Sequence, residues 1–417
     1  MSASPPLARS CEAILAPRLE QRILPGLARM HEALAALHHP ERHLRSVLVL
    51  GTNGKGSTAA LLASILRAHG LCVGLYTSPH LLRVEERLQV DGTPIAPLRL
   101  QQLLEELEAF PRLSYFETLT VAAILEFAAR EVDVAVLEAG LGGRWDATNA
   151  FPPAISLLTN VGTDHQAWLG PSRLHIAAEK AAALRGVEAI VGEWDGEVEG
   201  VIRSEATAPL TLASDWAEVA ASDDARGEGT VRFAVAGARG AAHLPLAGAH
   251  QRANLCLALA GAAALARHAL VPPLQAPRIA QGIEAVRWPG RWDRRPFRAG
   301  TLILDGAHNR EAIAAVAAQL QRTTRGEVDL LFSCLSDKPL AAMAATLRPL
   351  VRRVLVAPLD SPRATPVAAL AEAFPGCRVA SSVAQALASL PPGTTTLVTG
   401  SLRLVGEVLS HVEASDA

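Results

Sequence analysis

The chain has 417 residues, 50% hydrophobic and only 4% aromatic, and its 39 Lys and Arg side chains nearly balance 41 Asp and Glu side chains, giving a formal net charge of -2. This length predicts two or more domains, and the apolar composition excludes disorder as the main state. The near-neutral charge argues against nucleic acid as a general partner, because nucleic acids bind basic surfaces.

The five cysteines are far apart and form no Cys-x-x-Cys pair, so their spacing predicts neither a disulfide framework nor a thiolate zinc site. No secretory signal pattern is visible at the N-terminus. The longest apolar stretch, residues 255–266, is too short to cross a bilayer of about 30 Å. We therefore expect a cytoplasmic protein with no membrane partner.

The first part of the chain alternates between strand and helix patterns. Residues 46–50 predict a strand, residues 57–70 a helix after a glycine loop, and residues 72–76 a second strand. A helix at 116–130 and strands at 132–137 and 154–159 follow. Such alternation predicts a doubly wound, mostly parallel α/β sheet, in which ligands collect at the carboxyl ends of the strands.

The later part of the chain predicts an insertion and a second domain. Residues 193–246 have weak helical periodicity and indicate a β-rich, hairpin-containing insertion, and residues 288–296 indicate a linker. Strand and helix patterns then alternate again to residue 398. We expect a larger α/β domain at 1–295 and a smaller α/β domain at 296–417, with a cleft between them.

Residues 51–57, Gly-Thr-Asn-Gly-Lys-Gly-Ser, carry the strongest local signal. Glycines let backbone N–H groups approach phosphate oxygens, Lys55 can neutralise a phosphate, and Ser57 or Thr58 can ligate Mg²⁺. The pattern departs from the common phosphate-loop motif because Gly56 separates Lys55 from Ser57. The alternative is a glycine-rich turn without a ligand.

Further polar residues follow the later strands, where each has an ordinary structural alternative. Ser78, Glu138 and His165 come after predicted strands and could complete a shell of hard ligands for Mg²⁺. On pattern alone, Lys180 is a solvated surface residue, and His308 belongs to a capping segment. The residues by themselves thus predict a magnesium-nucleotide enzyme and no more.

Several strings in order along the chain resemble folylpolyglutamate synthase and dihydrofolate synthase, members of the Mur ligase family. Besides 51–57, they include Leu-Tyr-Thr-Ser-Pro-His-Leu at 75–81, Ser-Tyr-Phe-Glu at 114–117 and Asp-Gly-Ala-His-Asn at 305–309. The long string at 137–149 and Ala-Glu-Lys at 178–180 also match. The resemblance implies an ATP-dependent ligase that adds L-glutamate to the carboxylate of a reduced folate through an acyl phosphate.

The resemblance also implies roles for particular residues, with ATP as co-substrate and two Mg²⁺ ions. The catalytic residues would be Lys55, His308 and Lys180, the last carbamylated. ATP would be bound by Thr52, Asn53, Gly54, Lys55, Gly56, Ser57, Asn254, Arg291 and Asp305. The metal ligands would be Ser57, Ser78, Glu138 and His165. The folate would contact Ser114, Tyr115, Phe116, Glu117, Trp145, Asp146 and Ala147, with core packing as the alternative for Phe116.

The chain departs from the family at a few positions. Residues 23–27 read Ile-Leu-Pro-Gly-Leu and lack the Asp of many bifunctional members, which leaves use of dihydropteroate open. The family's Glu-Lys-Ala-Gly ends in Ala182 here, and Asp-His-Thr becomes Asp-His-Gln at Gln166. The alternatives are another Mur-type amino-acid ligase and a regulatory nucleotide-binding protein without turnover. We expect a monomer.

Overall fold

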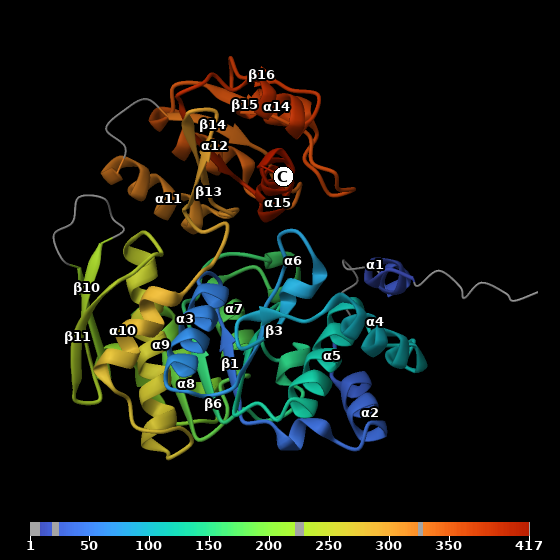
Figure 1. Cartoon of the computed structure of the whole chain (residues 1–417), viewed down its shortest axis with the longest axis vertical. Coiled ribbons are helices and arrows are strands. Elements are labelled where there is room, and N and C mark those ends of the chain that lie inside the picture. The colour runs from blue at the N-terminus through green and yellow to red at the C-terminus, as the bar shows by residue number, and fades with distance from the viewer. Residues whose placement is uncertain (1–8, 19–24, 222–228, 324–327, 417) are drawn as a thin grey trace, which may run out of the picture.

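The computed structural model describes residues 9–18, 25–221, 229–323 and 328–416, which form a larger and a smaller α/β unit stacked one above the other (Figure 1). The larger unit contains an eight-stranded sheet and the smaller one a six-stranded sheet. The predicted fold class is thereby confirmed. Of the departures from the family, residues 23 and 24 lie outside the described part of the chain. None of the helices described is both long and apolar enough to cross a membrane.

The eight-stranded sheet has β1 (Ser46–Leu50) in its interior, paired in parallel with β5 (Val134–Glu138) and β6 (Ile155–Leu158). All residues of these three strands are buried, as expected for parallel strands covered on both faces. The strand order is β4-β3-β2-β5-β1-β6-β7-β8, with β3 antiparallel to both of its neighbours. The remaining strands are β2 (Val73–Tyr76), β3 (Leu88–Val90), β4 (Thr93–Pro94), β7 (Glu188–Val191) and β8 (Leu210–Leu212).

Side chains of β1 alternate between the two faces of this sheet, and each face has its own hydrophobic cluster. Val47 and Val49 pack with α3, α9 and α10, whereas Leu48 and Leu50 pack with α7 and α8. A third hydrophobic cluster contains residues of β5 and of the N-terminal helices. The helices of the larger unit are α1 (Cys11–Leu15), α2 (Ala28–Ala36), α3 (Lys55–Ala68), α4 (Pro97–Glu106), α5 (Tyr115–Ala129), α6 (Gln166–Leu169), α7 (Arg173–Ala181), α8 (Gly196–Glu205), α9 (Ala249–Arg267) and α10 (Ala276–Ala285).

The expected β-rich insertion is shorter than the range predicted for it. Its first part, near residues 193–212, contributes α8 and β8 to the main α/β layers, because Val198 and Ile202 of α8 pack in the cluster under that sheet. Only β9 (Ala217–Ala221), β10 (Thr230–Val235) and β11 (Ala238–His243) form a separate antiparallel sheet. This small sheet packs against α9 and α10.

The smaller unit begins with a strand where a linker was predicted. β12 (Asp293–Phe297) pairs antiparallel with β13 (Gly300–Leu304), although its sequence is rich in Arg and contains Pro, as edge strands often are. The strand order is β12-β13-β17-β14-β15-β16, and the other pairs are parallel. The other elements are β14 (Val328–Phe332), β15 (Val354–Val356), β16 (Arg378–Val379), β17 (Thr395–Thr399), α11 (Arg310–Thr323), α12 (Leu340–Leu347), α13 (Val367–Ala373), α14 (Val383–Ser389) and α15 (Leu402–Asp416).

Candidate active site

A cavity of about 900 Å³ lies between the two units, at the carboxyl ends of the central strands of the larger sheet. One wall is formed by the loop after β1 and the segments after β2, β5 and β6, and the other by loops and α11 of the smaller unit. Residues from distant parts of the sequence thus meet there. The predicted site residues that line it are Thr52, Asn53, Gly54, Lys55, Gly56, Ser57, Ser78, Glu138, His165, Asn254, Arg291, Asp305 and His308.

The loop at residues 51–54 is fixed by hydrogen bonds to the segment that follows β6. Thr52 N donates to Asn160 O, and Asn53 N donates to Asn160 Oδ1, both at 3.0 Å. Thr159 Oγ1 donates to Asn53 O at 2.6 Å. The path of the loop is therefore set by neighbouring backbone and by short polar side chains.

Two positions in this loop require glycine. Gly51 has φ +144°, and a Cβ there would lie 1.8 Å from Thr159 Oγ1. Gly54, at the start of α3, has φ +85°, and a Cβ would lie 2.3 Å from Asn254 Oδ1. Both can adopt these conformations only without a side chain. The result is a loop with closely approachable backbone at a helix N-terminus, an arrangement suited to phosphate.

Two lysines converge on the first carbonyl of the loop. Lys55 Nζ donates to Gly51 O at 3.2 Å and Lys180 Nζ donates to the same oxygen at 2.9 Å. Lys180 is 4% exposed, so the surface position that its sequence pattern indicates is wrong. Burial, reinforced by the charge of Lys55, lowers the pKa of Lys180 to about 7. Lys180 lines a small cavity behind the loop, which it shares with Lys55 and His165.

Oxygen donors for a cation lie beside the start of α3. Glu138, at the end of β5, is buried, and its Oε2 accepts from Ser78 N at 3.0 Å. Burial raises the pKa of Glu138, while the charge of Lys55 opposes that rise. Ser57 and Ser78 supply hydroxyls on the same wall. Oxygen donors of this kind fit a hard cation that takes its remaining ligands from phosphates and water.

Asp164 and His165 follow β6 on the same wall of the cavity. Burial lowers the pKa of His165 to about 4, so its imidazole is neutral near pH 7 and able to act as a ligand. Burial alone would raise the pKa of Asp164, but His165 and Lys338 hold it below its usual range. Asp164 is therefore a carboxylate in a largely buried setting.

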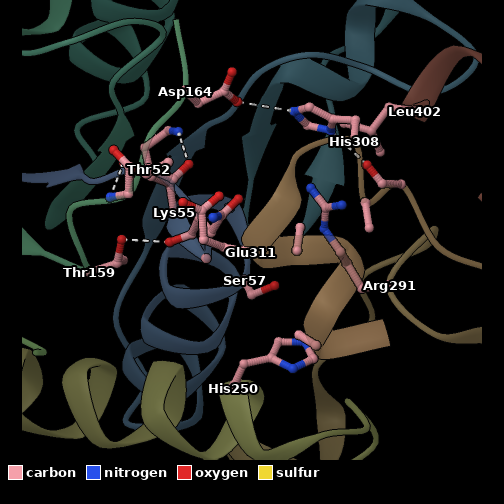
Figure 2. A pocket seen from close by; sticks show the side chains of 18 of the residues that line it. Thr52, Lys55, Ser57, Thr159, Asp164, His250, Arg291, His308, Glu311 and Leu402 are labelled. Atoms are coloured by element: carbon pink, nitrogen blue, oxygen red, sulfur yellow. Dashed lines mark hydrogen bonds and ion pairs between the residues drawn. The ribbon is translucent and has the colours of Figure 1, made fainter. Parts of the chain in front are cut away.

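The smaller unit supplies the opposite wall, where Arg291 and His308 face Lys55 and Ser57 of the larger unit (Figure 2). Asp305 accepts backbone N–H bonds from Trp292 and Ala307, each at 2.9 Å, although burial raises its pKa. His308 Nδ1 lies 2.7 Å from Gly306 O. A carbonyl can only accept, so Nδ1 carries the proton. Burial lowers the pKa of His308 to about 4, which leaves Nε2 as an acceptor.

The start of α9 contributes a polar end of the cavity that the sequence reasoning identified only in part. Asn254 Nδ2 donates to Gln251 Oε1 at 2.9 Å, and both side chains line the cavity. His250 also lines it, and burial lowers the pKa of His250 to about 4. His250 and Gln251 were missed because they lie three or four residues before Asn254, where a helix start gives polar residues an ordinary capping role.

The residues predicted to contact folate line neither of these two cavities. Ser114 and Glu117 form a capping box at the start of α5, and Glu117 also pairs with Arg29 at 2.9 Å. Asp146 accepts from Leu141 N at 2.8 Å and, like Ala147, is buried. These contacts within the protein account for the positions of Ser114, Glu117 and Asp146 without a bound substrate. A folate role for them stays a prediction.

The aromatic members of that set have mixed surroundings. Phe116 packs against Tyr76 with ring centroids 5.7 Å apart, a contact of the kind that the core-packing alternative predicts. The guanidinium of Arg87 lies 5.1 Å from the centre of the Tyr115 ring. Trp145 is 54% exposed. A folate role for Tyr115, Phe116 and Trp145 stays a prediction.

Several cavity residues of the smaller unit were missed by sequence reasoning. Lys338, Arg363 and Glu311 line the cavity, and Lys338 Nζ binds Asp164 Oδ1 at 2.9 Å across it. Lys338 follows β14 at its carboxyl end, the end where ligands collect in parallel sheets. That placement is the signal that could have identified it.

Comparison with known families assigns most of the chain. Residues 49–262 match the Mur ligase middle domain, and residues 290–402 match the Mur ligase, glutamate ligase domain. The chain is 34% identical to the dihydrofolate synthase/folylpolyglutamate synthase of Bacillus subtilis, over 84% of this chain and 84% of that one.

Two further similarities concern a longer relative and a solved structure. A probable bifunctional folylpolyglutamate synthase/dihydropteroate synthase of Haloferax volcanii is 35% identical over 93% of this chain, which spans only 48% of that relative. A crystal structure of a bifunctional folylpolyglutamate synthase/dihydrofolate synthase with manganese, AMPPNP and L-glutamate bound aligns with a TM-score of 0.84 and 30% identity. That alignment covers 97% of this chain and 98% of the other.

Proposed function

This chain belongs to the Mur ligase family, and we propose that it uses ATP to join L-glutamate to the carboxylate of a reduced folate, as a folylpolyglutamate synthase. The observation that carries the proposal is the cavity itself: a phosphate loop on one unit faces His308 and Arg291 of the glutamate ligase domain. The solved relative binds AMPPNP, manganese and L-glutamate, which supports a nucleotide, a divalent metal ion and glutamate as the ligands of this chain.

The reaction proceeds in two steps. A carboxylate oxygen of the folate attacks the γ-phosphorus of ATP, the bond to the bridging oxygen breaks, and ADP leaves with its electron pair. The glutamate amino nitrogen then attacks the acyl carbon and phosphate leaves, so that an amide, phosphate and a proton result. Lys55 and the backbone N–H groups at residues 52–57 bind the nucleotide phosphates and offset charge on the transferring group. Both walls keep water from the acyl phosphate.

His308 takes the proton of the incoming amine. Its Nδ1–H is held by Gly306 O, and its Nε2, which lies 3.8 Å from Asp164 Oδ2, carries no proton and faces the cavity. A neutral imidazole can accept a proton, whereas an imidazolium cannot. Burial, which lowers its pKa to about 4, keeps His308 neutral at physiological pH.

Lys180 is carbamylated. The neutral amine attacks carbon dioxide, one proton leaves, and the lysine ends as an anionic carbamate. The pKa of about 7 supports this role, because a large fraction of the side chain is neutral at physiological pH. Its position behind the loop, in the cavity shared with His165, would place the carbamate oxygens beside that ligand.

The residues present fit a divalent cation. Ser57, Ser78 and Glu138 would hold one Mg²⁺, and His165 with the carbamate of Lys180 a second; the ions would neutralise the phosphate oxygens of ATP. Glu138, whose Oε2 accepts from Ser78 N, supplies a carboxylate next to one of these hydroxyl-bearing residues, as suits a cation that keeps phosphate and water ligands.

Glutamate occupies the end of the cavity formed by the smaller unit. Arg363 and Arg403 line this end and can meet its carboxylates, while Asp360 and Glu407 can meet its ammonium group. The same cavity contains His308, which takes the amine proton. We also propose that the protein acts in the cytoplasm, which accords with its cysteines, since all five are free thiols. We propose that it is a monomer.

The test is an assay with ATP, Mg²⁺, L-glutamate and tetrahydrofolate. ADP and phosphate should appear in equal amounts, and mass spectrometry should show the folate extended by glutamate. A parallel reaction with dihydropteroate decides whether the chain also makes dihydrofolate. Absence of product from both acceptors overturns the proposed function.

A further inference from the structure

One carboxylate of the larger unit binds a group of side chains from the smaller unit. Lys338 Nζ lies 2.9 Å from Asp164 Oδ1, and Asn309 Nδ2 lies 3.1 Å from Asp164 Oδ2. His308 Nε2 is 3.8 Å from the same Oδ2, a contact drawn in Figure 2. The side chains of Asp164 and Lys338 are only 11% and 5% exposed. Their ion pair is therefore largely shielded from solvent.

Neighbouring contacts also join the smaller unit to the phosphate loop and to the segment after β6. Asn309 Nδ2 also donates to Asn53 Oδ1 at 2.9 Å. Glu311 Oε1 accepts from Thr163 Oγ1 at 2.8 Å and from Thr163 N at 3.1 Å. Residues 160–165 thus support the phosphate loop on one side and receive the start of α11 on the other.

We propose that Asp164 is a positioning residue that closes the smaller unit onto the phosphate loop through its ion pair with Lys338. The pair spans the cavity, and neither residue has a role in the proposed chemistry. Loss of Lys338 leaves a largely buried carboxylate without its cation, which destabilises the closed interface, and opening that interface returns the charge to water. Opening in turn carries His308 and Arg291 away from Lys55.

A different use of Lys338 makes a different prediction. Lys338 Nζ also lies 3.6 Å from Asp337 Oδ2, and Asp337 pairs with Arg363 at the proposed glutamate end of the cavity. If Lys338 served only as a ligand for a substrate carboxylate, its removal would raise the KM for glutamate and leave the arrangement of the units unchanged. The separation of the units is thus the measurement that distinguishes the two roles.

The primary test is small-angle X-ray scattering of the full chain without nucleotide, metal or folate. Lys338→Met and Asp164→Asn should each increase the radius of gyration, and Lys338→Arg, which keeps the cation, should not. The matched control is Glu199→Gln, which removes a carboxylate from an exposed ion pair with Arg203 inside α8 and should leave the profile unchanged. A wild-type profile for Lys338→Met overturns the proposal.

A second measurement uses turnover and rests on the proposed function. Each single variant should lower kcat by up to about 10²-fold through displacement of the reacting groups. The double variant should be no slower than the slower single one, because both changes remove the same contact; additive losses contradict the proposal. Asp164 also accepts from His165 N at 2.8 Å, so Lys338→Met, which leaves that bond intact, decides the matter if Asp164→Asn misfolds. An inactive wild-type protein overturns the proposed function but not the scattering result.

Discussion

The phosphate loop and the wall that faces it are held in place by different kinds of contact. Thr52 and Asn53 are fixed by hydrogen bonds within one unit, to the neighbouring segment after β6. The opposite wall, which carries His308, reaches the loop through Asn309 and reaches the supporting segment after β6 through Lys338 and Glu311. The first wall is thus prearranged by contacts within its own unit, while the second depends on closure. Substitutions on the two walls should therefore fail in different ways.

The largest effect is expected at Lys55. Lys55→Met removes the cation that offsets charge on the transferring phosphoryl group, and should lower the rate of ADP release by about 10³-fold. The scattering profile should stay that of the wild type, because the loop remains held by backbone hydrogen bonds. Arg67→Met, an exposed change at the other end of α3, serves as the control. A rate within tenfold of wild type would remove Lys55 from the proposed mechanism.

Lys180 gives a second prediction on the prearranged wall. Lys180→Met should lower turnover by about 10²-fold, since groups that support a metal site commonly carry losses of this size. In the wild type, turnover should rise with pH through about 7, where the lowered pKa of Lys180 converts the ammonium ion into the neutral amine that binds carbon dioxide.

Carbamylation itself can be seen without turnover. ¹³C-labelled bicarbonate should give a carbamate signal in the NMR spectrum of the wild type that is missing from Lys180→Met. If both proteins give identical spectra and the activity is flat between pH 6 and 8, a range of about one unit either side of that pKa, the carbamate is excluded.

Arg363 tests the wall that depends on closure. It is 41% exposed and pairs with Asp337 at 2.8 Å, so its contribution to glutamate binding is expected to be modest, about 1 kcal/mol. Arg363→Met should raise the KM for glutamate about fivefold and leave the KM for ATP unchanged. Equal increases in both constants would show that this end of the cavity does not select the amino acid.

The smallest effect is expected at Thr163. Thr163→Val removes the hydroxyl bond to Glu311 and keeps the bond from the backbone N–H. Loss of one such bond costs about 1 kcal/mol, and kcat should fall only a few-fold. Thr163→Ser, which retains the hydroxyl, should match the wild type. A loss as large as that expected for Lys338→Met would move the main closing contact from Asp164 to this pair.

The residues that the sequence could predict and those that it missed also divide between the two walls of the cavity. The phosphate loop is one contiguous string between a strand and a helix, so local pattern identified its elements, while the phosphate-binding role of its residues stays a prediction. Lys338 lies 174 residues from Asp164, so its place after the carboxyl end of β14 could have marked it as a cavity residue, but no local pattern names Asp164 as its partner. At 114–117 the sequence allowed a second explanation that was not weighed: Ser114 and Glu117 have the spacing of a helix capping box, and the structure shows that cap, while their folate role stays a prediction.

The small antiparallel sheet has a practical consequence. β10 and β11 are joined by a tight turn in which Ala236 and Gly237 have positive φ angles of 48° and 82°, and both residues are exposed. The hairpin lies on the flank of the larger unit (Figure 1), and no residue of it lines the cavity. Exposed turns of this kind accept inserted sequence well. A fluorescent domain or affinity peptide grafted between these two residues should report on the enzyme while leaving both walls of the cavity undisturbed.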